Sequence, residues 1–125
     1  MEDQIVTENS IDICEIDNEM YSETKAILKA KFSTIVDEYI EDSSKYIENI
    51  KQSVISKNAI IVAENAHPLK SSSYSFGLNG LGKVAEIIEH TAKNSLDDSW
   101  VEEVSDLLPK IDAAFEFVCE RIKSL

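Results

Sequence analysis

The sequence predicts an all-α protein that folds as an antiparallel four-helix bundle. Glycine and proline are scarce, at three and two residues of 125. No segment alternates apolar and polar residues for long, as a half-buried strand would. Four segments instead carry apolar residues at the i, i+3, i+4, i+7 spacing of an amphipathic helix. Such helices, joined by short connections, pack most simply as antiparallel neighbours.

The first two helices are predicted on either side of Ser56. The first covers residues 21–54, with apolar side chains at helical spacing at Leu28, Phe32, Ile35, Tyr39, Tyr46 and Ile50. Ser56 is the predicted N-cap of the second helix, which runs toward Gly77. Gly77 is expected to end that helix, because glycine readily adopts the left-handed conformation that follows many helices. An acidic lead-in over residues 1–20 comes before both, and a short extra helix within it is left open.

The third and fourth helices follow from two further apolar stripes. The third helix is predicted from Leu81, Val84, Ala85, Ile88 and Ala92, and residues 94–99 then form a loop. Ser99 and Glu102 have the spacing of a capping box, which predicts the start of the fourth helix. Its inward residues are Val101, Val104, Leu108, Ile111, Phe115, Val118 and Ile122. Pro109 is expected to bend this helix, because proline removes a helical hydrogen bond.

Length and charge limit the function classes. The chain is long enough for one domain, with the lead-in at 1–20 and the bundle at 21–125, and we expect a monomer. Its 24 acidic and 12 basic residues give a net charge of -12, which argues against nucleic acid and anionic membranes as partners. No apolar run approaches the roughly 20 residues of a membrane span. Cys14 and Cys119 match no zinc or redox spacing, which indicates reduced thiols in a cytoplasmic protein, with a disulfide between them as the alternative.

The histidine in AHPLKSSSYSFG, residues 66–77, is predicted to be exposed. With Leu69 at the centre of the apolar face, the positions within roughly 60° of it are Val62, Ala66, Ser73 and Phe76. His67 lies about 160° away on the opposite face. The other residues predicted on this outer face are Ile60, Ala63, Glu64, Lys70, Ser71 and Tyr74. A solvated histidine without function is the alternative to a reactive one.

The neighbours of His67 favour the reactive interpretation. Lys70 and Ser71 lie one turn further along the same face, so an ammonium and a hydroxyl flank the ring. A neutral imidazole has one nitrogen with a free lone pair near pH 7, which makes it a capable nucleophile. A phosphoryl group on that ring would bring roughly two negative charges, for which Lys70 is a local cation. Ile60 offers the kind of apolar contact that a docking partner would cover.

These residues resemble the signature of histidine-containing phosphotransfer (HPt) domains, the shuttle proteins of multistep phosphorelays. The family motif is His-x-Leu-Lys-(Gly or Ser)-Ser-(Ser or Ala)-x-x-x-Gly, followed by a helix that ends in Leu-Glu. The matching positions here are His67, Leu69, Lys70, Ser71, Ser72, Ser73 and Gly77, continued by Leu81, Ala85 and the pair Ile88–Glu89. Many members have glycine where Ser71 lies. The strong similarity covers residues 66–92, and the family's fold is also a four-helix bundle.

The resemblance implies a role for each matching residue. His67 would be the phosphoacceptor, reacting through Nε2, and Lys70 would stabilise the phosphoryl oxygens. The protein would exchange phosphoryl groups with receiver domains of response regulators and hybrid sensor kinases. It would have no kinase activity of its own, because nothing in the sequence resembles an ATP-binding domain. It would also have no cofactor of its own, because the receiver supplies Mg²⁺. The residues expected to meet the receiver are Ile60, Ala63, Glu64, Ser71, Tyr74 and Gly77.

Two other functions are left open. A helical interaction module could bind receivers without carrying phosphate. A carboxylate-bridged metalloenzyme could use Glu64 and His67, which form an E-x-x-H unit. That unit lies on the outer face and has no second copy at the required spacing, so no metal site is predicted.

Overall fold

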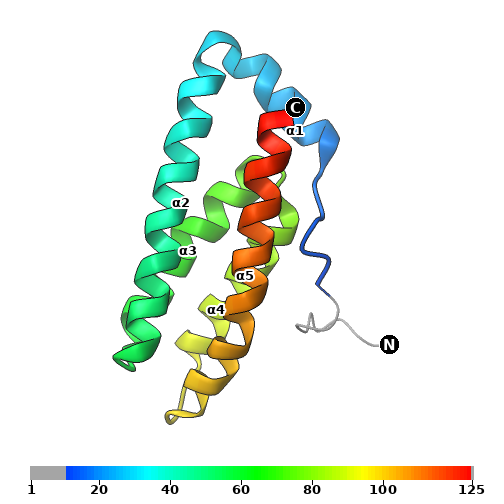
Figure 1. The fold of residues 1–125 in the computed structure, drawn as a ribbon. Helices are drawn as coiled ribbons and strands as arrows, with labels where there is room; N and C mark the ends of the chain where they lie inside the picture. The colour runs from blue at the N-terminus through cyan, green and yellow to red at the C-terminus, as the bar shows by residue number, and fades with distance from the viewer. Residues whose placement is uncertain (1–10, 125) are drawn as a thin grey trace.

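The computed structural model describes residues 11–124, which form helices joined by short connections (Figure 1). The elements are α1 (Asn18–Leu28), the 3-10 turn η2 (Lys29–Lys31), α2 (Phe32–Ile55), α3 (Ala59–Ser75), α4 (Asn79–Lys93) and α5 (Ser99–Ser124). No strand occurs in this part of the chain, and the predicted all-α class is confirmed.

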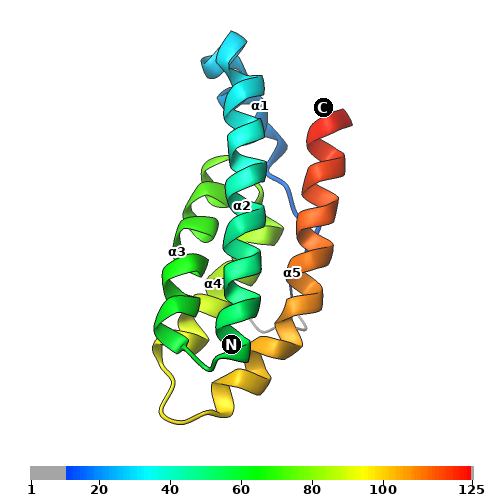
Figure 2. The same cartoon turned by 60° about the vertical axis from the view of Figure 1, so that its left-hand side comes forward.

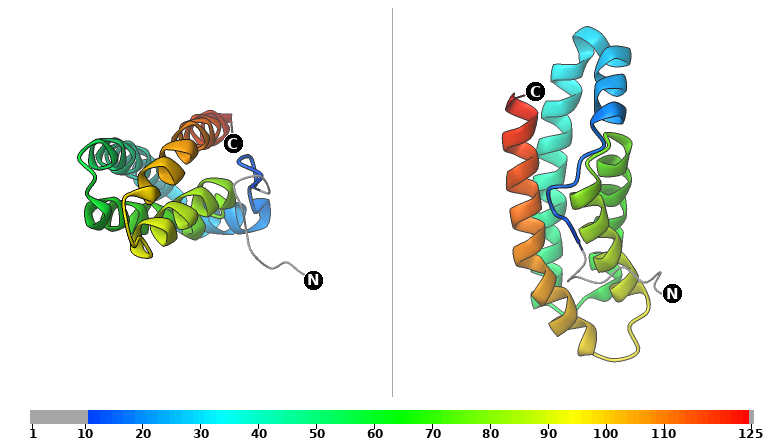
Figure 3. Two further views of the ribbon diagram at one scale, coloured as in Figure 1. Left: turned by 90° about the horizontal axis from the view of Figure 1, so that it is seen from below. Right: turned by 90° about the vertical axis from the view of Figure 1, so that its right-hand side faces the viewer.

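The four long helices run alternately down and up around one core. In Figure 1, α2 and α4 descend while α3 and α5 ascend, and the views in Figures 2 and 3 show the four around a common axis. α3 packs against α2 and α4, and α5 closes the ring by packing against α4 and α2. The predicted antiparallel bundle is therefore confirmed. None of the helices within residues 11–124 has the length and apolar character needed to cross a membrane.

The first predicted helix, residues 21–54, is wrong in its continuity. The chain breaks at Lys29, which has a φ of 53°, and α2 starts only at Phe32. A positive φ is unfavourable for a residue with a side chain. Aromatic packing compensates, because the buried ring of Tyr21 meets Phe32 edge-on at 5.5 Å between ring centres. α1 therefore folds back over the end of the bundle, and it takes in residues that had been assigned to the first long helix.

The start of α3 also differs from the prediction, whereas its end agrees. Asn58 is the N-cap, since its side chain accepts a hydrogen bond from the amide of Ile61 at 3.1 Å. Ser56 instead follows the last residue of α2, so its predicted role as N-cap is wrong. Gly77 has a φ of 75° and follows α3 directly after Phe76, as its expected stop function requires.

The apolar stripes of α4 and α5 are buried largely as predicted. All five predicted residues of α4 are buried. In α5 the buried residues are Trp100, Val104, Leu107, Ile111, Ala114 and Val118, while Val101, Leu108, Phe115 and Ile122 are partly buried against them. α5 already includes Ser99, which was predicted to cap it, and the amide of Ser99 donates to Asp97 Oδ1 at 2.9 Å. Pro109 lies within α5.

The described part of the lead-in lies alongside the start of α4 (Figure 3). The amide of Asp17 donates to the carbonyl of Gly77 at 2.7 Å, and the amide of Gly80 donates to the carbonyl of Glu15 at 2.9 Å. A Cβ on Gly77 would lie 2.8 Å from the carbonyl oxygen of Asp17. The glycines thus let this segment approach the backbone closely. Cys14 and Cys119 are not joined, so the alternative of a disulfide is wrong.

Candidate functional site

His67 projects from the middle of α3, and its side chain is 60% exposed. The opposite face of the helix is buried as the helical wheel predicts, at Val62, Ala66, Leu69 and Ser73. Ser73 Oγ lies 2.7 Å from the hydroxyl of Tyr39 in α2, which ties the back of α3 to its neighbour. The rigid inner face therefore holds the histidine outward, and the predicted exposure of His67 is confirmed.

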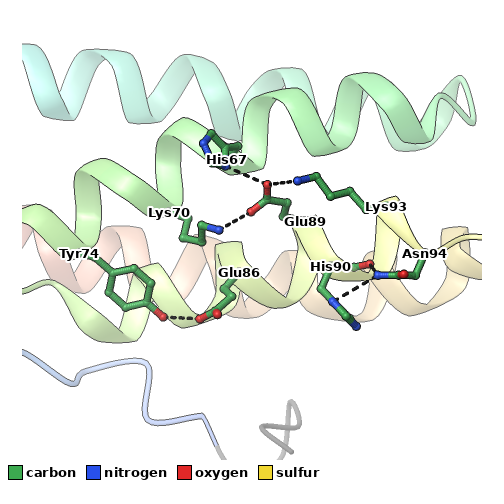
Figure 4. Close-up of polar contacts among 8 residues, drawn as sticks. All are labelled: His67, Lys70, Tyr74, Glu86, Glu89, His90, Lys93 and Asn94. Atoms are coloured by element: carbon green, nitrogen blue, oxygen red, sulfur yellow. Dashed lines mark hydrogen bonds and ion pairs between the residues drawn. The ribbon is translucent and has the colours of Figure 1, made fainter.

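Glu89 of α4 reaches the ring of His67 from the neighbouring helix (Figure 4). Its Oε2 lies 2.9 Å from His67 Nδ1 and 2.9 Å from the ammonium of Lys93. Its Oε1 lies 2.7 Å from the ammonium of Lys70, an ion pair whose angles fall outside hydrogen-bond geometry. One carboxylate thus collects three partners from α3 and α4.

The carboxylate of Glu89 is buried and ionised. Its side chain is only 4% exposed, because Glu89 lies next to the buried stripe of α4. Burial raises the pKa of this carboxyl, but the contacts with Lys70, Lys93 and His67 outweigh that effect and lower the pKa to about 2. A buried charge without such partners would be strongly unfavourable. The two lysines are therefore what keeps a negative charge at this position.

The charge of Glu89 decides which nitrogen of His67 can react. An ionised carboxylate only accepts hydrogen bonds, so the short contact requires Nδ1 to carry a proton and donate it. In the neutral ring the other nitrogen, Nε2, then holds the lone pair. The arrangement can therefore present a nucleophile at Nε2 and balance a positive charge that develops on the ring.

Glu89 and Lys93 are site residues that the sequence analysis missed. Glu89 entered only as part of the family motif, without a role, and Lys93 did not enter at all. A local signal existed for both, since Glu89 lies four residues after the buried Ala85 and four before Lys93, which puts it between the core and a cation. The contact with His67 could not be predicted, because it depends on how α3 packs on α4.

The predicted docking residues fall into separate groups. Ile60, Glu64 and His67 line an open groove of about 620 Å³ with Ala59, Ala63, Glu89, Ala92, Lys93 and Ser95. Ile60 is 71% exposed and extends the apolar surface beside His67. Ala63 also borders this groove, but it is only 8% exposed, so its predicted place on the outer face is wrong. Ala63 is buried because α3 packs closely against α4.

Ser71, Tyr74 and Gly77 lie away from that groove. Ser71 is exposed and faces a different hollow, toward α2. The hydroxyl of Tyr74 donates to Glu86 Oε1 at 2.6 Å, and its ring lies over Gly82, where a Cβ would come within 2.8 Å of it. Gly77 is buried beneath Asp17 and Met20. The geometry thus gives Tyr74 and Gly77 structural contacts of their own.

The other histidine, His90, has a different partner. Its Nδ1 lies 3.2 Å from the amide nitrogen of Asn94, the residue that follows α4 (Figure 4). Glu64 and His67 form no larger cluster either: among residues 11–124, no three histidine, cysteine, aspartate or glutamate side chains gather as a metal site would need.

Comparison with known families supports one assignment. A family model described as Hpt domain matches residues 34–115, which run from the first turn of α2 into α5 and include His67, Lys70, Glu89 and Lys93. Comparison with curated protein sequences gives no match.

Proposed function

The chain belongs to the Hpt domain family, and from that premise we propose that it carries a phosphoryl group on His67 between the aspartates of receiver domains. Hpt domains are phosphotransfer modules of phosphorelays; they interact with receiver domains and are phosphocarriers rather than kinases. The observation that carries the assignment to His67 is its contact with Glu89. An exposed imidazole whose Nδ1 is held by a buried carboxylate has its lone pair at Nε2.

The proposed phosphoryl transfer needs no group of this chain as a reactant other than the ring of His67. The Nε2 lone pair attacks phosphorus, the bond between phosphorus and the aspartyl oxygen breaks, and that oxygen leaves with the bonding electrons as a carboxylate. Nδ1 keeps its proton, so the ring becomes a phosphorylated imidazolium. Glu89 then faces the new positive charge at 2.9 Å, which stabilises the product and the transition state that leads to it.

Lys70 supports the phosphoryl group in this proposal. It lies one helical turn after His67, and an ammonium has three N–H donors, of which Glu89 occupies one side. The remaining donors can bind phosphoryl oxygens. The receiver supplies Mg²⁺ and the acidic residues that hold it, so this chain needs no metal of its own.

The groove beside His67 is the proposed docking surface for the receiver. Its apolar part, around the exposed Ile60, adjoins the histidine, so a receiver that covers it brings its aspartate toward Nε2. Covering exposed apolar side chains favours association. Glu64 borders the groove as a polar residue at its rim.

Label transfer tests the proposal directly. Receiver domains are phosphorylated with labelled acetyl phosphate, freed of the donor and mixed with the protein. We expect label on the wild type and none on His67→Gln, whose fold should stay intact, because the side chain is exposed and the two lysines still hold Glu89. The label should be lost in acid and kept in base, as a P–N bond is. Acid-stable label, label on His67→Gln, or binding of receivers without transfer would each contradict the proposal; the last would identify an interaction module.

A further inference from the structure

The side chains gathered around Glu89 carry more positive charge than negative charge. Two ammonium groups, from Lys70 and Lys93, lie within 2.9 Å of a single carboxylate. With a neutral His67 the group of side chains therefore has a surplus of one positive charge. The whole chain is strongly acidic, with a net charge of -12, so this surplus on Glu89 and its partners is against the trend of the chain. An incoming dianion is the partner that such a surplus suits.

The two lysines hold Glu89 in different ways. Lys70 is the only one of the three partners on Oε1, and its side chain is 25% exposed. Lys93 shares Oε2 with Nδ1 of His67, and its side chain is 61% exposed. If Lys70 left, Oε1 would be buried without a cation, which is costly. If Lys93 left, Oε2 would still accept the proton of Nδ1, so Lys93 is the cation that can move.

We propose that Lys93 is a second phosphoryl-binding residue, which leaves Glu89 and binds the phosphoryl oxygens when His67 is phosphorylated, while Lys70 stays on Glu89. The inference rests on the proposed role of His67 as phosphoacceptor. Phosphorylation of His67 favours the movement of Lys93 from Glu89 to the phosphoryl group in two ways. The new dianion attracts the ammonium of Lys93, and the new positive charge on the imidazolium replaces the charge that Glu89 loses.

The position of Lys93 fits this role. A polar hollow of about 230 Å³ lies between α3 and α4, with His67, Lys70 and Lys93 on its wall. Both ammonium groups therefore border the space beside the ring, one from each helix (Figure 4). Glu86 and His90 also border it. Glu86 accepts a hydrogen bond from the hydroxyl of Tyr74, which leaves its negative charge in place, and His90 Nδ1 lies 3.2 Å from the amide nitrogen of Asn94.

A cation on the phosphoryl oxygens should lengthen the life of the phosphohistidine. Hydrolysis of the P–N bond passes through a loose, metaphosphate-like transition state. The oxygens carry about two negative charges before the bond breaks and about one in metaphosphate, so an ammonium on them stabilises the starting state more. Loss of Lys93 should therefore speed the loss of phosphate.

The experiment uses a donor that needs no receiver. Phosphoramidate phosphorylates an exposed imidazole chemically, and the half-life of phosphorylated His67 is then followed by ³¹P NMR after the donor is removed. We expect Lys93→Met to shorten the half-life by about fivefold to tenfold and Lys93→Arg to restore most of it, since arginine keeps the charge. Lys45→Met is the matched control. Lys45 also pairs with a glutamate four residues away on its helix and is 67% exposed, but it lies on α2.

The outcomes separate this inference from the proposed function. An unchanged half-life in Lys93→Met, or an equal effect of Lys45→Met, overturns the role of Lys93 even if receivers transfer label normally. A shortened half-life with rescue by arginine supports that role even if no receiver transfers label, in which case only the relay is wrong. The measurement is made with His90→Gln in the background of every variant, because His90 is also exposed. If phosphoramidate then fails to label His67, the role of Lys93 is overturned, whereas the relay is judged by label transfer from the receiver. The folded fraction of each variant is checked by its thermal transition.

Discussion

Glu86 and Glu89 lie one turn apart on α4 and both meet side chains of α3, yet the two contacts are built differently. Glu86 is exposed and accepts one hydrogen bond from the neutral hydroxyl of Tyr74 at 2.6 Å. Glu89 is buried and is surrounded by two ammonium groups and an imidazole. If the contact of Glu86 is lost, water can hydrogen-bond to its carboxylate, so the free-energy cost is small. Glu89 is buried, so water cannot replace its partners there. The interface between α3 and α4 thus contains a single solvent-exposed hydrogen bond at Glu86 and a buried group of charges at Glu89.

The difference bears on the proposed role of His67, which lies beside Glu89. A nucleophile that becomes positively charged needs a fixed negative charge nearby, and that charge is most effective where water is excluded. Burial provides this setting, and the two lysines keep the carboxylate ionised within it. Glu86 has the same functional group but is solvated, so its charge would act weakly on a neighbouring ring.

The largest effect is expected from removing the charge of Glu89. Glu89→Gln keeps the size of the side chain, but an amide cannot balance the imidazolium that forms when Nε2 takes the phosphoryl group. A charged hydrogen bond of this kind is worth roughly 1.5–3 kcal/mol, so transfer from a phosphorylated receiver should slow by about 10-fold to 150-fold. Glu86→Gln, the same change one turn away, should keep the rate within about threefold of the wild type. Similar rates in the two variants would remove the distinction between the two glutamates.

A smaller effect is expected from Lys70. Lys70→Ala should slow transfer and shorten the life of the phosphorylated form by about tenfold, because the ammonium binds phosphoryl oxygens at a site open to solvent. Receiver affinity should hardly change, since the proposed docking surface is the apolar groove around Ile60. A time course of transfer and a titration with unphosphorylated receiver measure the two quantities. Weaker binding with an unchanged rate would assign Lys70 to docking.

The sequence was informative where structure depends on neighbours along the chain. The outward direction of His67 and the buried stripe of α4 follow from helical periodicity alone, and both are confirmed. The break at Lys29 could not be predicted in this way, because no glycine or proline marks it. It depends on Tyr21 reaching Phe32 across the turn.

The site shows the same limit. The motif identified His67 and Lys70, because both belong to one helix and share one face. The partners of Glu89 could not be derived, since they depend on the approach of α4 to α3. The prediction for Ala63 is wrong for a related reason. Its angle on the helical wheel predicts exposure, but the neighbouring helix covers it. The periodicity of one helix predicts which of its residues face outward, but not which residues of the neighbouring helix meet them.

The last prediction concerns stability, and it sharpens the comparison of Glu86 and Glu89 through pH. The pKa of Glu89 is about 2 in the folded protein and near its ordinary value of 4.5 when the chain is unfolded. In acid the unfolded state therefore takes up a proton that the folded state resists, and stability rises with pH in this range. The contribution of Glu89 is fully present above about pH 4.5 and is lost as the pH falls toward 2.

Urea unfolding between pH 3 and pH 6 measures this contribution as the difference in unfolding free energy between the wild type and Glu89→Gln. That difference should shrink as the pH is lowered, because the variant has no carboxyl to protonate at this position. Glu86→Gln, measured alongside, supplies the baseline for replacing a carboxylate on the same helix. A difference that stays constant across the range would mean that Glu89 is not held ionised by its three partners, and the argument for a proton on Nδ1 would lose its basis.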